Sequence, residues 1–305
     1  IAMSTKAKVF IGLGLYLLIT VILLLLVPSE GKNEHFQPQN EFKLEPWIKI
    51  DIAGIDFSIN RAVLYLALAS LLTIAVMVFL AKRMQAKPNK VQMAVEIAYD
   101  LVRNNITRGN IPDEELARRW FPYTAGLFFF IWFSNMLGYL PLPTNTEHTV
   151  HIFGLEVPTL GLYAATANIS IPVVLALVST AAYHIEGIRK KGFFKYFASW
   201  LPAGLETMNP FGKAAIWLIE AVSHFVRPIS LSVRLFANIL AGHLLILFMA
   251  GGLAVLLGLA ALGALTFPMA FAFFVFEIGL VATLQAFIFS TLTAIYIGGA
   301  TAEAH

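Results

Sequence analysis

The sequence predicts an all-α membrane protein with five to six transmembrane helices, a long tilted C-terminal helical hairpin and a surface amphipathic helix. Charged residues make up only 13% of the chain, whereas soluble domains contain about 25%. Of its 305 residues 58% are hydrophobic, and the mean hydropathy is +0.76. Several apolar runs reach the roughly 20 residues that an α-helix needs to cross the hydrocarbon core of a bilayer.

The first apolar run covers residues 10–27 and follows two lysines. A basic start and a leucine-rich core are typical of a signal sequence, but no small-x-small cleavage site follows in residues 27–30, which favours a retained helix. The predicted division is therefore an N-terminal region of residues 1–47, with an extra helix and an external polar segment, and a membrane domain of residues 48–305.

The second predicted span covers residues 61–80 and is ended by Lys82 and Arg83. The segment after it, residues 87–119, is polar and basic, yet apolar residues recur in it at i, i+3, i+4 and i+7 spacing. This pattern is typical of an amphipathic helix that lies along the membrane surface. The apolar residues concerned are Val91, Ala94, Val95, Ala98, Leu101 and Val102.

Two further spans are predicted at residues 121–142 and at about 160–185, joined by a short loop that carries His148 and His151. A second basic loop then leads to Lys213, after which the chain is apolar almost to its end. The Gly251-Gly252 pair and the small residues after it predict a turn between two long helices, which would form the C-terminal hairpin.

The basic residues predict the orientation of the chain. The N-terminal lead and the segments 81–119 and 186–213 hold fifteen of the twenty-one lysines and arginines, and the loop after the third span holds none. The positive-inside rule then places these three segments in the cytoplasm, with six crossings and both termini inside. Removal of the first helix would leave five crossings and an N-terminus outside.

The composition also excludes several classes of function. Because cysteine is absent, the chain has no disulfides, thiolate metal sites or cysteine nucleophiles. A net charge of +3 is too small to indicate a nucleic-acid partner, and no G-x-x-x-x-G-K-[ST] phosphate loop occurs. We therefore expect no cofactor, no metal and no catalytic chemistry on this chain.

Arg234 is the most informative residue, because a charge deep in a membrane helix is costly. An arginine at the centre of a membrane helix costs at least ~2.5–3.5 kcal/mol on insertion scales. The nearest other ionisable side chains, Arg227 and His243, are seven and nine residues away along the chain. Such a guanidinium is either half of an ion pair that fixes helix packing or a fixed charge beside an ion path.

Helical geometry predicts which residues share a face with Arg234. At 100° per residue, Asn238 lies about one turn above it, Ser230 about one turn below, and Glu220 within ~40° of the same face and ~21 Å lower. His243 points to the opposite side. Pro228 predicts a kink, because it removes one backbone hydrogen bond.

Glu277 and Gln285 lie eight residues apart in the last helix, roughly 80° around and ~12 Å along its axis. A buried glutamate and a histidine on facing helices are suited to a proton relay, since both can titrate near neutral pH. Taken singly, His243 is equally well explained as a core histidine, and Glu277 as its structural partner. An unpaired arginine and two amides in the same pair of helices favour the relay.

These residues resemble the signature of ATP synthase subunit a. The resemblance covers about residues 48–296, and the segment around Arg234 is highly specific. The matching stretches are EAVSHFVRPISLSVRLFAN at 220–238, LQAFIF at 284–289, PNKVQM at 88–93, NMLGYLP at 135–141 and TANISI at 166–171.

The resemblance implies a role for each polar residue. Arg234 would face the essential carboxylate of the c-ring, keep it ionised as it passes and block a direct proton leak. The predicted half-channel from outside is lined by Asn238, His243, Glu277 and Gln285. The half-channel to the cytoplasm is lined by Glu220, with Ser230 and His224.

The same resemblance implies a multi-pass protein of a prokaryotic plasma membrane. Its partners would be the c-ring proteolipid, the peripheral-stalk b subunits, the rest of an F-type ATP synthase and membrane lipid. The alternative is a stand-alone secondary transporter or ion channel, which also places ionisable groups at the midplane. Against it stand the absence of an internal repeat and the isolation of Arg234.

Three features depart from the family pattern. The helix at residues 10–27 has no counterpart in the usual five-span core, and Asn168 stands where aspartate is common. Glu277 precedes Gln285 by eight residues where the family has seven. The additional residue would rotate the carboxylate by about 100° unless a π-bulge near Gly279 absorbs it.

Overall fold

The computed structural model describes two compact units, which we treat separately. The larger unit comprises residues 45–239 and 281–305, and the smaller comprises residues 1–44 and 240–280. The predicted first helix, residues 10–27, lies largely outside the described residues. The residues described are 14–16, 18, 21–22, 44, 46–52, 55–82, 85, 89–140, 142–152, 155–161, 163–201, 208–252 and 260–302.

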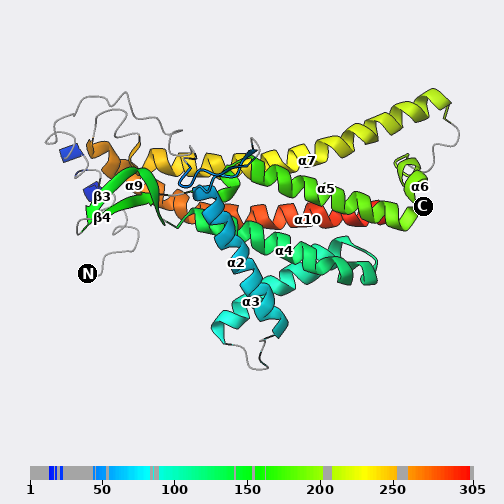
Figure 1. Ribbon diagram of the computed structural model, residues 1–305, viewed down its shortest axis with the longest axis horizontal. Helices are drawn as coiled ribbons and strands as arrows, with labels where there is room; N and C mark the ends of the chain where they lie inside the picture. Colours follow the sequence, from blue (N-terminus) through cyan, green and yellow to red (C-terminus); the bar gives the residue numbers. More distant parts are fainter. Residues whose placement is uncertain are drawn as a thin grey trace. The chain divides into compact units, whose positions relative to one another are not determined.

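The larger unit is built mainly of helices (Figure 1). Helix α7 begins in this unit and crosses residue 239 into the other. The bounds are α2 Arg61–Lys82, α3 Lys90–Asp100, the π-helical stretch η2 Leu101–Arg108, α4 Glu114–Gly138, the 3-10 turn η3 Ala165–Ala167, α5 Ser170–Lys191, α6 Phe193–Ala198, α7 Pro210–Leu247 and α10 Ala282–Thr301.

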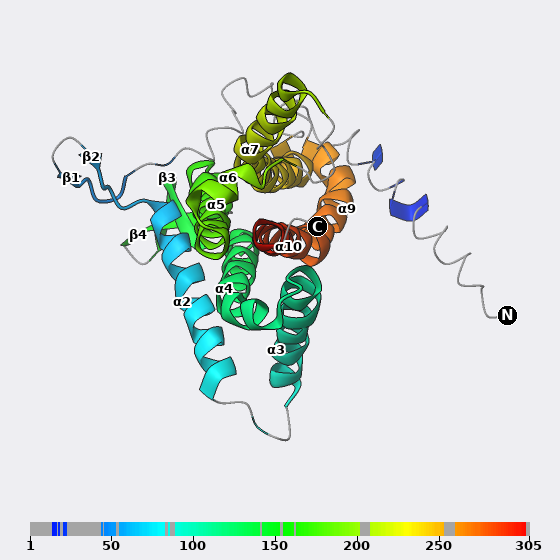
Figure 2. The same ribbon diagram turned by 90° about the vertical axis from the view of Figure 1, so that its right-hand side faces the viewer.

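Helix α10 lies at the centre of this unit, packed against α4 and α5, while α2 contacts the side of α4 (Figure 2). Its inward positions are mostly small, including Ala282, Ala286 and Ala294, each with 0% exposure. At Gly298 the backbone carbonyl of Asn110 lies where a side chain would begin. Small residues allow membrane helices to approach closely, which is what holds α10 in the bundle.

Buried polar side chains bond to each other across these helices. The Thr166 hydroxyl donates to Asn135 Oδ1 at 2.7 Å, and the hydroxyls of Thr107 and Thr124 lie 2.7 Å apart. Trp132 Nε1 donates to Thr283 Oγ1 at 3.1 Å, which ties α4 to α10. Because hydrocarbon offers no alternative partner, such bonds favour one arrangement of the helices.

Asp113 explains why α4 begins at Glu114. Its carboxylate accepts the backbone N–H groups of Glu115 and Leu116 at 3.1 and 3.2 Å, as an N-cap residue does. The bond from Leu116 lowers the pKa of Asp113 below its usual value of 3.8, and the nearby Lys190 lowers this pKa further. Lys190 Nζ lies 3.4 Å from the other carboxylate oxygen, so the start of α4 is joined to the end of α5.

Four helices of the described chain are long and apolar enough to cross a membrane, namely residues 61–80, 170–191, 210–250 and 266–301. The predicted all-α membrane fold with a long C-terminal hairpin is therefore confirmed. Helix α4, predicted as the third span, extends further toward the N-terminus than expected and buries one side in the bundle. The predicted amphipathic segment is helical over α3 and η2, with Ile97 exposed and Val102 buried.

The segment with His148 and His151 is a β-hairpin, so the predicted loop was wrong. Strand β3, Leu142–Ile152, pairs antiparallel with β4, Leu155–Gly161. β-Branched residues such as Val150 and Val157 favour strands here. As a result α5 begins at Ser170, about ten residues later than the predicted fourth span, and ends at Lys191. A second, very short hairpin joins β1, Asp51–Ile52, to β2, Ile55–Asp56.

The smaller unit contains the end of α7 and the first part of the last long helix. The π-helical turn η4, Phe248–Gly252, follows α7, and α9 covers Ala260–Phe276 and contacts η4. At the glycine pair, where a turn was predicted, the chain is π-helical and continues α7; residues 253–259, which lead to α9, lie outside the described residues. The π-helical turn η5, Glu277–Val281, then follows α9, at the place where the sequence carries its additional residue.

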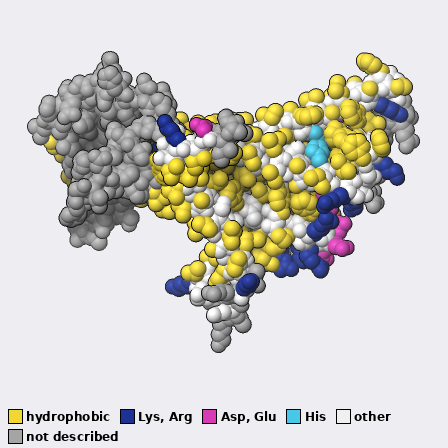
Figure 3. All heavy atoms as spheres, viewed as in Figure 1, with side chains coloured by type: hydrophobic (Ala, Val, Ile, Leu, Met, Phe, Trp, Pro, Cys, Tyr) yellow, Lys and Arg dark blue, Asp and Glu magenta, His cyan; other side chains and the backbone are white. Residues whose placement is uncertain are grey.

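Charged side chains gather around the start of α4 and the end of α5, while apolar side chains cover most of the remaining surface shown in Figure 3. Arg119 Nη1 lies 3.4 Å from Glu186 Oε1, and Arg108 Nη2 lies 3.1 Å from Glu114 Oε1. Basic residues collect on the cytoplasmic side of membranes, and the predicted cytoplasmic location of these segments stays a prediction.

Candidate functional site

Arg234 is exposed on α7, and within the described part of the chain it has no ion pair or hydrogen bond. The ion pairs of that part join other residues, among them Arg227 and Glu220. Among the described residues, this observation argues against a packing ion pair, and the role of Arg234 beside an ion path stays a prediction. The described fold supplies no carboxylate that would tie the guanidinium into a packing ion pair.

The residues around Arg234 form what we call the open face of α7. The inward face of the same helix carries Leu231, Leu235 and Ile239, which are 4%, 1% and 0% exposed. The open face comprises Val222, Phe225, Val226, Ile229, Ser230, Val233, Arg234, Ala237 and Asn238, all exposed.

The open face is apolar apart from a single charge and two short polar side chains, Ser230 and Asn238. Arg234 therefore lies in a surface suited to lipid or to another membrane protein, not to water. As predicted, Ser230 and Asn238 share the exposed side of the helix with Arg234. Pro228 lies within α7, where a kink remains a prediction.

Glu220 lies further toward the start of α7, where it is half-buried and paired with Arg227. The Oε2 atom of Glu220 is 3.8 Å from Arg227 Nη2. The guanidinium carbon of Arg227 also lies 5.1 Å from the ring centre of Tyr296 on α10, a cation–π distance. Arg227 thus joins α7 to α10 and holds the Glu220 carboxylate at the mouth of a cavity.

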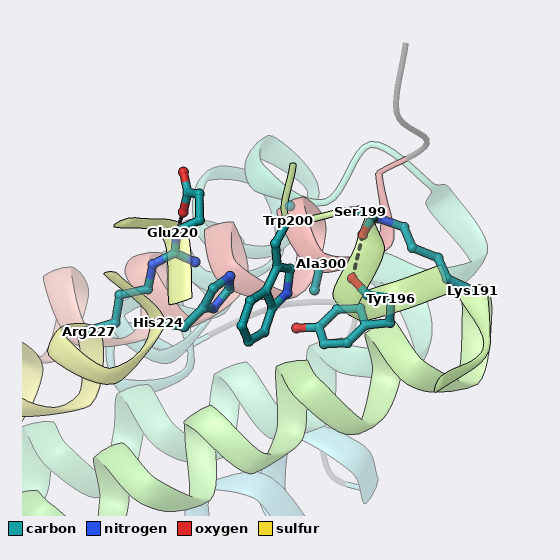
Figure 4. A pocket seen from close by; sticks show the side chains of 9 residues that line it. Lys191, Tyr196, Ser199, Trp200, Glu220, His224, Arg227 and Ala300 are labelled. Carbon is teal, nitrogen blue, oxygen red and sulfur yellow. Dashed lines mark hydrogen bonds and ion pairs between the residues drawn. The ribbon is translucent and has the colours of Figure 1, made fainter. Parts of the chain in front are cut away.

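The cavity has a volume of about 260 Å³ and is formed by α5, α6, the end of α10 and the start of α7 (Figure 4). It is partly open and mixes charged and aromatic walls, so it has both the room and the polar partners that water requires. Its lining residues are Lys191, Tyr196, Ser199, Trp200, Glu220, His224, Arg227, Gly299 and Ala300.

His224 lies in the wall of this cavity, and its ring is stacked on Trp200 with centroids 4.3 Å apart. Its Nδ1 atom is 3.2 Å from the Tyr183 hydroxyl. A second imidazole, His184, lies 5.3 Å away between ring centres, and its Nδ1 is 2.8 Å from the Tyr196 hydroxyl. The structure therefore places Glu220 and His224 in the lining of the same cavity, while their role in a half-channel stays a prediction.

Sequence reasoning missed His184, Tyr183, Tyr196 and Trp200. His184 near the basic end of a span was a usable signal, because a histidine inside a membrane span is rare and usually functional, and Tyr183 lies next to it in the sequence. Tyr196 and Trp200 gave no such signal. They reach the cavity only because α6 turns back at Gly192, whose φ of 81° favours glycine, and because the Tyr196 ring rests on Gly187.

Gln285 is buried on the inner side of α10, with 5% exposure. Its amide has no hydrogen-bond partner among the described residues. A buried amide of this kind usually bonds to a water or a ligand. This placement is suited to a polar path through the bundle, although the structure does not bring Gln285 to the cavity beside Glu220.

Glu277 and His243 belong to the smaller unit, where both are buried, with 7% and 4% exposure. The Glu277 carboxylate lies against Gly242, at the place where a larger residue would have its Cβ atom. Gly242, which precedes His243, has no side chain and therefore leaves room for the Glu277 carboxylate. The π-helical turn η5 begins at Glu277, so the bulge expected near Gly279 is present.

No group of three or more potential metal ligands occurs among the described residues. The polar side chains here are a fixed cation, an amide, carboxylates, imidazoles and hydroxyls. Such groups can hold water and pass protons.

Comparison with known proteins gives the context for these groups. The family model described as ATP synthase A chain matches residues 63–298. ATP synthase subunit a of Rubrobacter xylanophilus is 35% identical over 254 residues, which cover 83% of this chain and 88% of that protein. The subunit of Rhodospirillum rubrum is 32% identical, covering 86% and 97%, and that of Hyphomonas neptunium is 31% identical, covering 88% and 97%.

Proposed function

Because the chain belongs to the ATP synthase A chain family, we propose that it is the proton-translocating stator subunit of a rotary F-type ATP synthase. In this proposal the chain forms two offset half-channels against the c-ring, and Arg234 separates them. The chain performs no catalysis itself, and ATP chemistry takes place elsewhere in the complex.

The observation that carries the proposal is the unpaired guanidinium on an apolar face. An exposed arginine among Val233, Ile229 and Phe225 is costly in lipid. The cost is offset if a second chain brings a carboxylate to it, which is what an acidic residue on each c-ring subunit would do. The open face of α7 is then the face toward the rotor.

The rotor carboxylate can leave this face only when it is neutral, since a buried charge in lipid is unfavourable. A proton from outside neutralises it, and the subunit turns into the bilayer. After nearly a full turn the carboxyl meets the other half-channel and releases the proton. Each elementary charge that falls through 100 mV supplies about 2.3 kcal/mol for this rotation.

Each half-channel is assigned its own residues. Glu220, Ser230 and His224 belong to the cytoplasmic side, and the polar cavity beside Glu220 supports this assignment because it lies at the basic end of the bundle. Asn238, His243, Glu277 and Gln285 belong to the side that faces away from the cytoplasm.

The family places the chain in a membrane and in an ATP synthase complex. We further propose that this membrane is a prokaryotic plasma membrane, crossed several times. The direct partners are then the c-ring on the open face of α7, the peripheral-stalk b subunits and membrane lipid.

The test replaces Arg234 by alanine in the whole complex. We expect Arg234→Ala to abolish proton-driven ATP synthesis in proteoliposomes while the subunit still copurifies with the c-ring. The matched control is Val233→Ala, which changes the neighbouring exposed position and should leave synthesis near normal. Near-normal synthesis by Arg234→Ala would refute the proposal. A chain that purifies and conducts protons without a small proteolipid would support the stand-alone transporter.

A further inference from the structure

The cavity at the end of α5 is lined by His224, which the proposed function already assigns to the cytoplasmic half-channel, and a second imidazole, His184, lies next to it. His224 lies in the cavity wall, while His184 lies behind it and contacts the cavity through Tyr196. Each ring has a tyrosine hydroxyl at its Nδ1, at 3.2 Å for His224 and 2.8 Å for His184. The same imidazole–phenol pairing therefore occurs twice, once between α5 and α7 and once between α5 and α6.

We propose that His224 and His184 form a proton relay between the Glu220 cavity and the cytoplasm. The inference rests on the proposed function and adds named proton carriers to its cytoplasmic half-channel. Resemblance to the family pointed to Glu220 on this side, whereas His184 and both tyrosines come from the structure.

The geometry allows the relay to work through Nε2 of each ring. The tyrosine hydroxyls occupy Nδ1, and neither Nε2 atom has a hydrogen-bond partner in the part of the chain that the structure describes. The ring centres are 5.3 Å apart, so the two imidazoles are direct neighbours, and in the proposed relay a water bonded to both rings connects them. Each imidazole takes up a proton to become imidazolium and returns to neutral when it releases that proton to the next water.

Several groups surround the two rings, and they fix the environment in which the relay would titrate. The facing groups are Tyr183 and Lys191 from α5, Tyr196 from α6, Trp200 from the turn after α6, Glu220 and Arg227 from α7, and Tyr296 from α10.

If His184 and His224 served only to pack against their neighbours, any aromatic ring of similar size could stand in their place. Trp200 stacks on His224 and on Trp217, and Tyr183 contacts His184, as aromatic packing requires. Phenylalanine would fill these places without an imidazole that has to be hydrated. Proton transfer, in contrast, depends on the ring nitrogens, so the two roles can be separated by experiment.

The experiment uses the whole synthase in proteoliposomes and measures ATP-driven proton pumping against the pH on the cytoplasmic face. The variants are His224→Ala, His224→Gln and His184→Gln, each normalised to assembled complex, and the control is Trp217→Phe. A general acid–base group contributes typically 10²–10⁴-fold to proton transfer, but water in the cavity carries part of the flux, so we expect about a tenfold loss.

Imidazole added on the cytoplasmic side provides the decisive readout. The His224→Ala variant leaves additional space beside a cavity of about 260 Å³, so free imidazole should enter and restore pumping. We expect this rescue in His224→Ala, a flattened pH profile in both glutamine variants, and neither change in Trp217→Phe.

Normal pumping and an unchanged pH profile in His224→Gln and His184→Gln would overturn the relay. A loss in His224→Ala that imidazole does not restore would also overturn it, because it would indicate a packing role. Neither result touches the proposed function, which fails only if Arg234→Ala still supports ATP synthesis.

Discussion

Replacement of Gly242 by alanine tests whether the position of Glu277 matters for proton uptake. The Cβ atom of alanine would coincide with the Glu277 carboxylate, so the carboxylate must move. Because this group is the flexible end of a side chain, the movement should cost little stability, about 0.5–1.5 kcal/mol for a shifted rotamer. Alanine gains up to about 1 kcal/mol over glycine within a helix, so the net change in unfolding free energy should be close to zero.

The effect on function should be much larger than the effect on stability. A hydrogen bond to a charged group contributes about 1.5–3 kcal/mol. If the displaced carboxylate loses one such bond in the proton-transfer step, the rate should fall about 10- to 100-fold, since 1.36 kcal/mol corresponds to about a factor of ten. The assay is ATP-driven acidification of inverted membrane vesicles, together with thermal unfolding of the purified complex.

Gly279→Ala is the matched control, because its Cβ would meet nothing within 4 Å and the residue lies in the same part of the last long helix. It should keep both pumping and stability. The reasoning is refuted if Gly242→Ala pumps as fast as Gly279→Ala. It is equally refuted if Gly242→Ala loses assembly, since that would place the effect on folding.

Two further predictions follow from single groups. Glu277→Gln keeps the shape of the side chain but cannot take up a proton; pumping in vesicles should slow, and an unchanged rate would remove this carboxylate from the pathway. For Asp113, the pKa is lowered in the folded chain, so its stabilisation of α4 is present above the unfolded pKa and is lost as pH falls through the folded value. Between about pH 5 and about pH 3, the thermal midpoint of the complex should therefore fall further with the unchanged chain than with Asp113→Asn. An equal fall of the two thermal midpoints would contradict this prediction.

Much of the fold follows from the sequence because hydrophobic length and charge placement act locally. The runs at residues 61–80 and 210–250 are long enough that the bilayer permits only helix. The hairpin at residues 142–161 could not be predicted in this way, since its strands pair through backbone bonds whose register depends on contacts across a turn. The late start of α5 at Ser170 has the same origin.

Part of the candidate site could likewise be predicted from the sequence, and part of it could not. The shared face of Ser230, Arg234 and Asn238 follows from helical periodicity, and α7 presents it as expected. The cavity beside Glu220 depends instead on where α6 turns back. That turn depends on the left-handed Gly192 and on the close approach of Tyr196 to Gly187, neither of which appears in any periodic pattern.

The open face of α7 also bears on how such a complex is built. Before a rotor is present, the guanidinium of Arg234 would lie against acyl chains, and an isolated chain would carry an insertion cost of at least ~2.5–3.5 kcal/mol. We therefore expect this subunit to persist in cells only when it joins a preformed ring.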